Sequence, residues 1–238
     1  MTSDRARRRA TWFAIPGIMI LLALGSWQVH RLMWKTDLNE ERRAQFQAEA
    51  VMLPAALDDP TPFSYRRVWL EGQFRHEAEM FLAARTFDRR VGYQIITPFE
   101  RTDGPAVLVN RGWVPLDNKE PETRLGGQIQ GTHRLEGVVV PGGRTGWFTP
   151  DNEPENNVWF WTDTEALAAE AGIPAPSFLV DAGPAANPGG LPIGGQTKVE
   201  LRSQHMQYIV IWYALAISLG VIYAIYMRRG RSSDENEA

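Results

Sequence analysis

Residues 208–226 read YIVIWYALAISLGVIYAIY, and this apolar stretch decides the class of the protein. The uncharged region around it extends from residue 203 to residue 227, which is longer than the roughly 20 residues that a helix needs to cross a bilayer. A second uncharged region runs from residue 10 to residue 29 and contains the run WFAIPGIMILLAL. We therefore predict two transmembrane helices, at residues 10–29 and 203–227.

The first helix has an alternative interpretation as a cleaved signal peptide. Arginines precede its apolar run, and Ala23, Leu24 and Gly25 resemble a cleavage site. We expect the helix to be retained, because the uncharged region is long for a signal core and Trp27 and Trp34 follow it. Tryptophan is typical of the place where a permanent helix leaves the bilayer.

Arginines flank both predicted helices on their terminal sides, at residues 5 and 7–9 and at residues 228, 229 and 231. The positive-inside rule therefore places the tails 1–9 and 228–238 in the cytoplasm. Basic residues also occur at 31, 35, 42 and 43, but they belong to a long loop, and such loops translocate largely regardless of their charge. No extended presequence precedes the first helix, which favours a bacterial inner membrane over a mitochondrial one.

The segment between the helices is expected to form a helical stalk at residues 30–51 and a periplasmic β-rich domain at residues 52–202. Short runs of β-branched and aromatic residues alternate with Gly, Pro and Asp from Tyr65 onward. They predict an antiparallel sheet that curls or partly closes into a barrel, so the fold class is an α+β membrane protein. The expected strands are residues 67–74, 79–86, 93–99, 106–114, 134–140, 158–162 and 178–181.

One helix and one long loop are marked within this domain. Thr162 and Glu165 have the spacing of a capping box, and Gly172 followed by Pro174 ends the helix that it starts. The stretch AGPAANPGGLPIGG at residues 182–195 is too rich in glycine and proline for a regular element. It predicts a linker or a surface loop.

Composition and motifs argue against several classes of function. The chain has no cysteine, which excludes disulfides and thiolate metal sites, and its net charge of -3 gives no basic field for nucleic acid. No nucleophile elbow, phosphate-binding loop or dinucleotide-binding turn is present. His76 and Glu77 begin a zincin-like motif, but Met80 occupies the place of the second histidine. We expect neither an enzyme nor a nucleic-acid partner.

A histidine stands at the outer end of the second predicted helix. His205 is followed at helical spacing by Tyr208 and Trp212. An ionisable group at the membrane edge is costly without a partner, and a neutral imidazole nitrogen is a ligand of haem iron, so His205 is a candidate site residue. The alternative is an interfacial histidine that hydrogen-bonds to lipid headgroups, and spacing alone favours this alternative.

Three residues form a stripe where the first helix leaves the membrane. Trp27, Arg31 and Trp34 are separated by four and three residues, which places them on one helical face. A cation between aromatic planes suits a haem propionate. The alternative is a basic side chain that snorkels among interfacial tryptophans, and for these residues the sequence favours it.

Four separated stretches carry motifs in a fixed order. They are LGSWQVHRLMWK at residues 24–35, VNRGWVP at 109–115, FTPDNEPENNVWFWTD at 148–163 and HMQYIVIWYALA at 205–216. Together with the two-anchor layout, they resemble the Surfeit locus protein family of cytochrome c oxidase assembly factors over essentially the full chain. The resemblance differs at one place, because an asparagine is expected near the histidine where this chain has Ser203 and Gln204.

The resemblance implies a function in building the haem and copper centre of oxidase subunit I. Haem a would be bound transiently and passed on, which makes subunit I and a haem a synthesis enzyme the expected partners. The histidine of the family's second helix corresponds to His205, which reverses the preference given by spacing alone. The alternative is a membrane-anchored structural chaperone that grips the oxidase subunit and carries no haem.

Overall fold

The structure is a computed structural model that describes residues 2–57, 59–143, 145–201 and 204–235. Ser203, which opens the second predicted membrane helix, therefore lies outside the described residues. Contacts divide the chain into two units. A helical unit contains the residues up to Glu40 and from Leu201 onward, and a β-rich unit contains the residues from Glu41 to Glu200.

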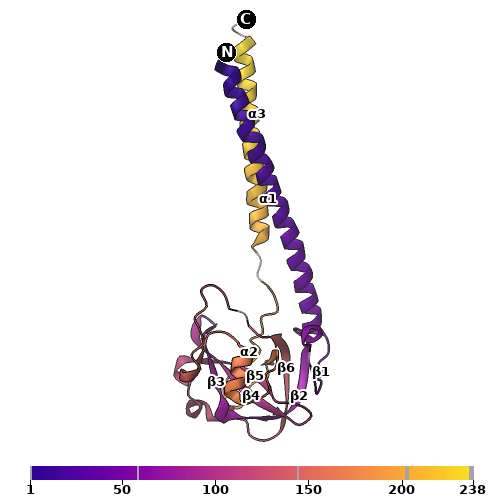
Figure 1. The fold of residues 1–238 in the computed structure, drawn as a ribbon, viewed down its shortest axis with the longest axis vertical. Coiled ribbons are helices and arrows are strands. Elements are labelled where there is room, and N and C mark those ends of the chain that lie inside the picture. The colour runs from indigo at the N-terminus through magenta and orange to yellow at the C-terminus, as the bar shows by residue number, and fades with distance from the viewer. Residues whose placement is uncertain (1, 58, 144, 202–203, 236–238) are drawn as a thin grey trace. The chain divides into compact units, whose positions relative to one another are not determined.

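Two long helices dominate the chain outside the β-rich unit (Figure 1). Helix α1 spans Thr2–Gln47 and helix α3 spans His205–Glu235. They run antiparallel, because the hydroxyl groups of Thr11 and Tyr223 are 2.9 Å apart near one end and the side chains of Ser26 and Tyr213 are 3.2 Å apart near the other. The arginine-bearing ends of the two helices therefore lie together.

Small residues allow the two helices to pack closely. A Cβ atom added at Gly25 would lie 3.1 Å from the Tyr213 ring, and one at Gly17 would lie 3.2 Å from the Leu219 side chain. Ala14 and Ala216 are buried at the same interface. Close approach at small residues is the usual way in which membrane helices associate.

Most of the apolar surface of both helices faces outward. Only 11% and 6% of the residues in their most apolar windows are buried, and large side chains such as Phe13 and Ile217 are 80% and 68% exposed. The helices are long and apolar enough to cross a membrane. A helix from the core of a soluble protein would bury this surface, so the exposure indicates membrane association.

The β-rich unit contains eight strands among its described residues. Their bounds are β1 Val51–Met52, β2 Arg67–Phe74, β3 Met80–Phe87, β4 Arg90–Arg101, β5 Val107–Pro115, β6 His133–Pro141, β7 Val158–Trp159 and β8 Phe178–Ala182. Each of the seven predicted strands overlaps one of them. Helix α1 ends at Gln47, and Val51, expected within the helical stalk, belongs to β1 instead.

Strand pairing closes a ring. β2 pairs with β6, β6 with β8, β8 with β5, β5 with β4, and the end of β4 returns to β2. This order is that of a five-stranded Greek-key barrel of the OB type, a likeness that carries no function by itself. The predicted antiparallel sheet is wrong in this respect: β5–β8, β1–β2 and β3–β7 are parallel, so the sheet is mixed.

Alternate residues of the barrel strands face two different cores. Val109 and Val180 belong to one cluster with Phe99, and their neighbours Leu108 and Leu179 belong to another. Helix α2, Thr164–Ala171, covers the second cluster with its buried residues Leu167, Ala168 and Ala171. The alternation follows from the two-residue period of a strand.

The predicted helix is confirmed, but its cap differs from the expected one. Asp163, not Thr162, is the N-cap residue, and its carboxylate accepts a hydrogen bond from the Ala166 backbone N–H at 3.1 Å. The Thr162 hydroxyl instead accepts a hydrogen bond from the Gly143 backbone N–H at 2.8 Å. Gly172, in the left-handed region at φ 61°, ends the helix as predicted.

The glycine-rich segment 182–195 is a surface loop that is tied to β5. The backbones of Trp113 and Ile193 exchange hydrogen bonds of 2.9 and 2.8 Å. Gly112 makes this approach possible, because its φ is +120° and a Cβ atom there would lie 2.0 Å from the Ile193 carbonyl oxygen. The glycine of the VNRGWVP stretch therefore has a packing function.

Candidate functional site

His205 is the first residue of α3 and contacts a glutamine of α1. Its Nδ1 lies 2.7 Å from Oε1 of Gln28. In the tautomer that donates from Nδ1 to this amide oxygen, the lone pair of the imidazole is on Nε2. This tautomer is the one in which Nε2 ligates a metal, and an oriented second nitrogen is typical of histidine ligands.

An open groove surrounds this pair within the helical unit. It has a volume of about 420 Å³ and is lined by Gln28, Lys35, Gln204, His205 and Tyr208. Gln28 and Lys35 are seven residues apart on α1, which places them on one helical face. The groove therefore combines an imidazole, a cation and an aromatic ring, a set that suits a planar anionic ligand.

The structure brings together only part of the predicted constellation. His205 and Tyr208 line the groove, whereas Trp27 and Trp34 are 57% and 47% exposed and are absent from its lining. The guanidinium of Arg31 lies 4.1 Å from the centre of the Trp34 ring, as the expected stripe implies. Trp212 is half-buried on α3 and does not line the groove.

Sequence reasoning noted Lys35 and Gln204 without assigning them to the site, and it did not single out Gln28. Gln28 lies within the quoted stretch LGSWQVHRLMWK, and Gln204 precedes His205 directly. Gln28 is identified only by its contact with His205, which depends on how α1 and α3, two helices far apart in sequence, are aligned with each other.

A second cluster of charged residues is buried in the β-rich unit. The Arg111 guanidinium donates to Oε1 of Glu79 at 2.8 Å, and Arg124 donates to Oε2 at 2.5 Å. Gln128 donates to Oε1 at 3.1 Å, and the His76 ring lies 3.4 Å from the same oxygen. The side chains of Glu79, Arg111 and Arg124 are at most 2% exposed.

These contacts shift the pKa values of the cluster. Burial raises the pKa of Glu79, but hydrogen bonds from His76 and Arg124 and the charges of Arg124 and Arg111 outweigh it and lower the pKa to about 2. Burial lowers the pKa of Arg111 to about 10, against the opposing charge of Glu79. Glu79 and Arg111 are therefore both charged at neutral pH.

The cluster has a structural explanation. Arg111 also donates to the backbone carbonyl of Gly127, and Arg124 donates to the carbonyls of Asn118 and Lys119. The cluster of Glu79, Arg111 and Arg124 therefore holds the loop between β5 and β6 against the start of β3. The terminal nitrogens of Arg111 and Arg124 are bound to Glu79 and to loop carbonyls, which gives the arginine of VNRGWVP a structural function.

The asparagines of the stretch at residues 148–163 organise turns. Oδ1 of Asn152 accepts hydrogen bonds from the backbone of Phe160 at 2.8 Å and of Trp161 at 3.2 Å. Asn157, left-handed at φ 49°, donates to the Glu79 carbonyl at 2.7 Å. By contrast, Trp147 and Phe148 are 100% and 99% exposed, and no core contact with the described residues explains them.

Comparison with known proteins agrees with the motif resemblance. The model of the SURF1 family matches residues 16–217. A SURF1-like protein of Monosiga brevicollis is 36% identical over 231 residues, which cover 92% of this chain and 88% of the relative. Surfeit locus protein 1 of Homo sapiens is 38% identical over 223 residues, which cover 87% of this chain and 74% of the relative. By these matches, the chain belongs to the SURF1 family.

Proposed function

We propose that this protein is an assembly factor for haem-copper cytochrome c oxidase, and that it binds haem a transiently and passes it to subunit I. SURF1 family members are known as cytochrome oxidase assembly factors and not as enzymes, which supports the general part of the proposal. The hydrogen bond between His205 and Gln28 is the observation that carries the haem-binding part, since it prepares an imidazole as a metal ligand.

The groove residues have distinct functions in this proposal. His205 ligates the haem iron through Nε2, and Gln28 fixes the orientation and tautomer of the ring. Lys35 pairs with a propionate, and Tyr208 contacts the face of the macrocycle. Trp27, Arg31, Trp34 and Trp212 are proposed to contact the parts of the cargo that extend beyond the groove.

Transfer requires that binding be reversible. A carrier that binds as tightly as the final site retains its cargo, because transfer follows the difference between the two affinities. A single histidine ligand in an open groove suits this need. The upstream partner is a haem a synthesis enzyme, and the downstream partner is subunit I.

We further propose that both helices span a bacterial inner membrane. The antiparallel arrangement places Arg5 and Arg7–Arg9 of α1 at the same end as Arg228 and Arg229 of α3, which the positive-inside rule assigns to the cytoplasm. His205 and Gln28 then lie toward the periplasmic surface, and the β-rich unit belongs to the periplasm.

A structural chaperone without haem is the second candidate. The fully exposed Trp147 and Phe148 favour it, because aromatic side chains are enriched at the centres of protein interfaces. Capture of subunit I by His205→Ala at the wild-type level, together with its loss in a Trp147→Ser/Phe148→Ser variant, would favour this candidate.

The experiment that tests the assembly function measures haem a per subunit I in cells that lack the protein. Wild-type protein should restore the haem a content, and His205→Ala should restore little of it. His30→Ala is a matched control, because His30 is an exposed histidine of α1 outside the groove lining. A normal haem a content in cells without the protein would contradict the proposal.

A further inference from the structure

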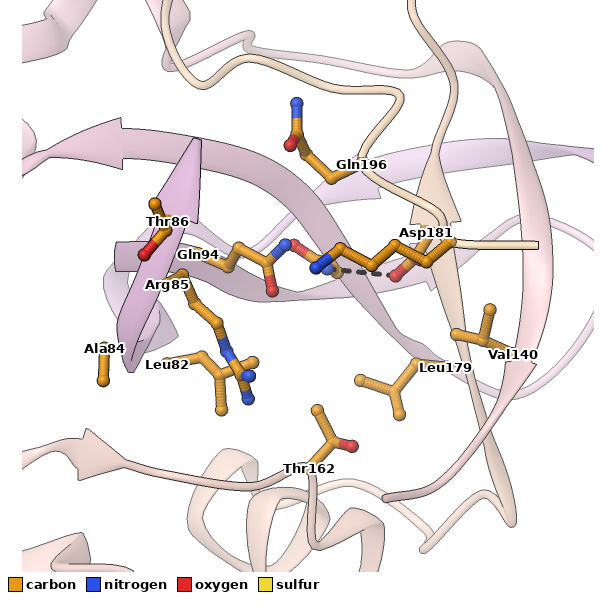
Figure 2. A pocket seen from close by; sticks show the side chains of 12 residues that line it. Leu82, Ala84, Arg85, Thr86, Gln94, Val140, Thr162, Leu179, Asp181 and Gln196 are labelled. Atoms are coloured by element: carbon orange, nitrogen blue, oxygen red, sulfur yellow. Dashed lines mark hydrogen bonds between the residues drawn. The ribbon is translucent and has the colours of Figure 1, made fainter. Parts of the chain in front are cut away.

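A second cavity lies on the outer face of the barrel, within the β-rich unit (Figure 2). It has a volume of about 390 Å³, within the range of small-molecule sites. Its apolar side is formed by Leu82, Val140 and Leu179, and its polar side includes Arg85, Lys198 and Asp181. The motifs and the haem-binding proposal account for none of these three charged groups.

Arg85 is directed into the cavity by an irregular strand. The pairing of β3 with β4 shifts register between Leu82 and Arg85, and Ala84 has φ +55°. A positive φ at alanine is strained, and such outliers and bulges concentrate at functional sites. Figure 2 shows the Arg85 side chain extending toward Leu82 and Thr162.

The guanidinium of Arg85 is only partly satisfied. One terminal nitrogen donates to the Phe160 carbonyl at 3.1 Å, while the buried Nε has no hydrogen-bond partner among the described residues. No ion pair connects Arg85 or Lys198 to a carboxylate in the described part of the chain. Two cationic groups therefore face one cavity without being ion-paired to a carboxylate of the described residues, an arrangement that favours an anionic ligand.

On the polar side of the cavity, Asp181 is a hydrogen-bond acceptor. Its carboxylate receives hydrogen bonds from Asn110 at 3.0 Å and Thr197 at 2.9 Å. Burial raises the pKa of Asp181, although these two hydrogen bonds lower it in part. Because the carboxyl oxygens of Asp181 accept hydrogen bonds here, a ligand that fits this side of the cavity presents a hydrogen-bond donor to Asp181.

The polar groups of the lining define the polar groups of the ligand. Arg85 and Lys198 provide two cationic groups and Asp181 one hydrogen-bonding carboxyl group, so a ligand with one carboxylate and one hydrogen-bond donor has a partner for each of its polar groups. We propose that this cavity binds a singly charged organic carboxylate that carries a hydroxyl donor and an apolar substituent. The carboxylate contacts Arg85 and Lys198, the hydroxyl donates to Asp181, and the apolar part packs on Leu82, Val140 and Leu179. The proposal is independent of haem binding at His205.

The test uses the full chain in detergent micelles and calorimetric titration with 3-phenyllactate, which has all three features. Two analogues serve as control ligands: 3-phenyllactamide lacks the negative charge, and 3-phenylpropionate lacks the hydroxyl group. We expect 3-phenyllactate to bind and each analogue to bind about tenfold more weakly or worse. Protein-free micelles provide the blank.

Two variants test the assignment of residues. Arg85→Gln and Lys198→Gln should each weaken binding of 3-phenyllactate by about tenfold, whereas exposed Arg89→Gln should leave it unchanged. Lys198 is exposed, so its replacement keeps the fold and weaker binding reports the lost contact. The absence of binding up to about 10 mM, equal binding of the amide, or unchanged binding by Arg85→Gln would each overturn the proposal.

Discussion

Arg111 and Glu79 form an ion pair of 2.8 Å in the interior of the β-rich unit, with both side chains at most 2% exposed. Arg124 completes the arrangement from the loop between β5 and β6. Because the charges are buried, removal of any one of these side chains leaves a buried charge without its partner and destabilises the fold. The arrangement therefore predicts a strong and pH-dependent effect when the single carboxylate is removed.

Glu79→Gln should lower the free energy of unfolding by about 3–5 kcal/mol at neutral pH, because it leaves Arg111 and Arg124 buried without a counter-charge. Hydrogen exchange of β3 and β5 in the full chain measures the change. Glu136→Gln is the control, since the Glu136 side chain is 53% exposed and its ion pairs lie on the surface. The control should change stability by no more than about 1 kcal/mol.

Acid should reduce the difference between wild type and Glu79→Gln. The pKa of Glu79 is lowered from 4.5 to about 2 in the folded protein, so its carboxylate stabilises the fold above pH 4.5. This contribution, of about 3 kcal/mol, is lost as the pH falls from 4.5 toward 2. Arg111 stays protonated throughout this range and adds no pH dependence. A difference that is constant from pH 7 to pH 3 would contradict this account.

Gly112→Ala should destabilise the β-rich unit by more than about 2 kcal/mol. The new Cβ would lie 2.0 Å from the Ile193 carbonyl oxygen, so the segment after β8 must move away from β5. Gly131→Ala is the matched control, because Gly131 also has a positive φ of +77° but no atom within 4 Å of its Cβ position. Equal losses in the two variants would show that φ alone, and not the contact with Ile193, determines the cost.

Two tryptophans near each other in sequence should respond in opposite ways. Trp159 is 0% exposed and packs in the cluster under α2, so Trp159→Ala should cost about 3–5 kcal/mol. Trp147 is 100% exposed, so Trp147→Ala should change stability by less than about 0.5 kcal/mol. Chemical denaturation of the full chain measures both, and a large loss from Trp147→Ala would indicate a contact that the structure lacks.

The sequence predicts those parts of the fold that depend on local patterns. Strand β2 has the predicted bounds of 67–74, and the helix that ends at Gly172 is present. Both could be predicted because the alternation of apolar and polar residues and the helix-capping pattern depend only on residues close together in sequence. The parallel pairing of Val109 with Val180 and the return of β4 to β2 depend on long-range register. Local sequence contains no signal for either, and the expected antiparallel sheet was wrong for that reason.

The same distinction applies to the candidate site. His205 and Tyr208 follow one another on a single helix, and their common location in the groove agrees with their spacing. Gln28 reaches His205 only because α1 and α3 are antiparallel with one particular register. Arg85 and Asp181 were not singled out, because strands distant in sequence bring them to one cavity.

Gln28→Leu tests whether the amide orients the His205 ring. Removal of a hydrogen-bond partner behind a metal ligand typically weakens metal binding by about 10-fold to 100-fold. We expect a loss of haem a affinity in this range, with the haem spectrum of a histidine-ligated iron retained in the fraction that binds. Gln47→Leu, at the far end of α1, is the control and should bind haem a as the wild type does.

The most direct measurement is the haem a content of the purified full chain after co-expression with the enzymes that make haem a. We expect wild type and His30→Ala to retain haem a, and His205→Ala to retain little of it. Equal occupancy in wild type and His205→Ala would contradict the assignment of His205 as the main ligand.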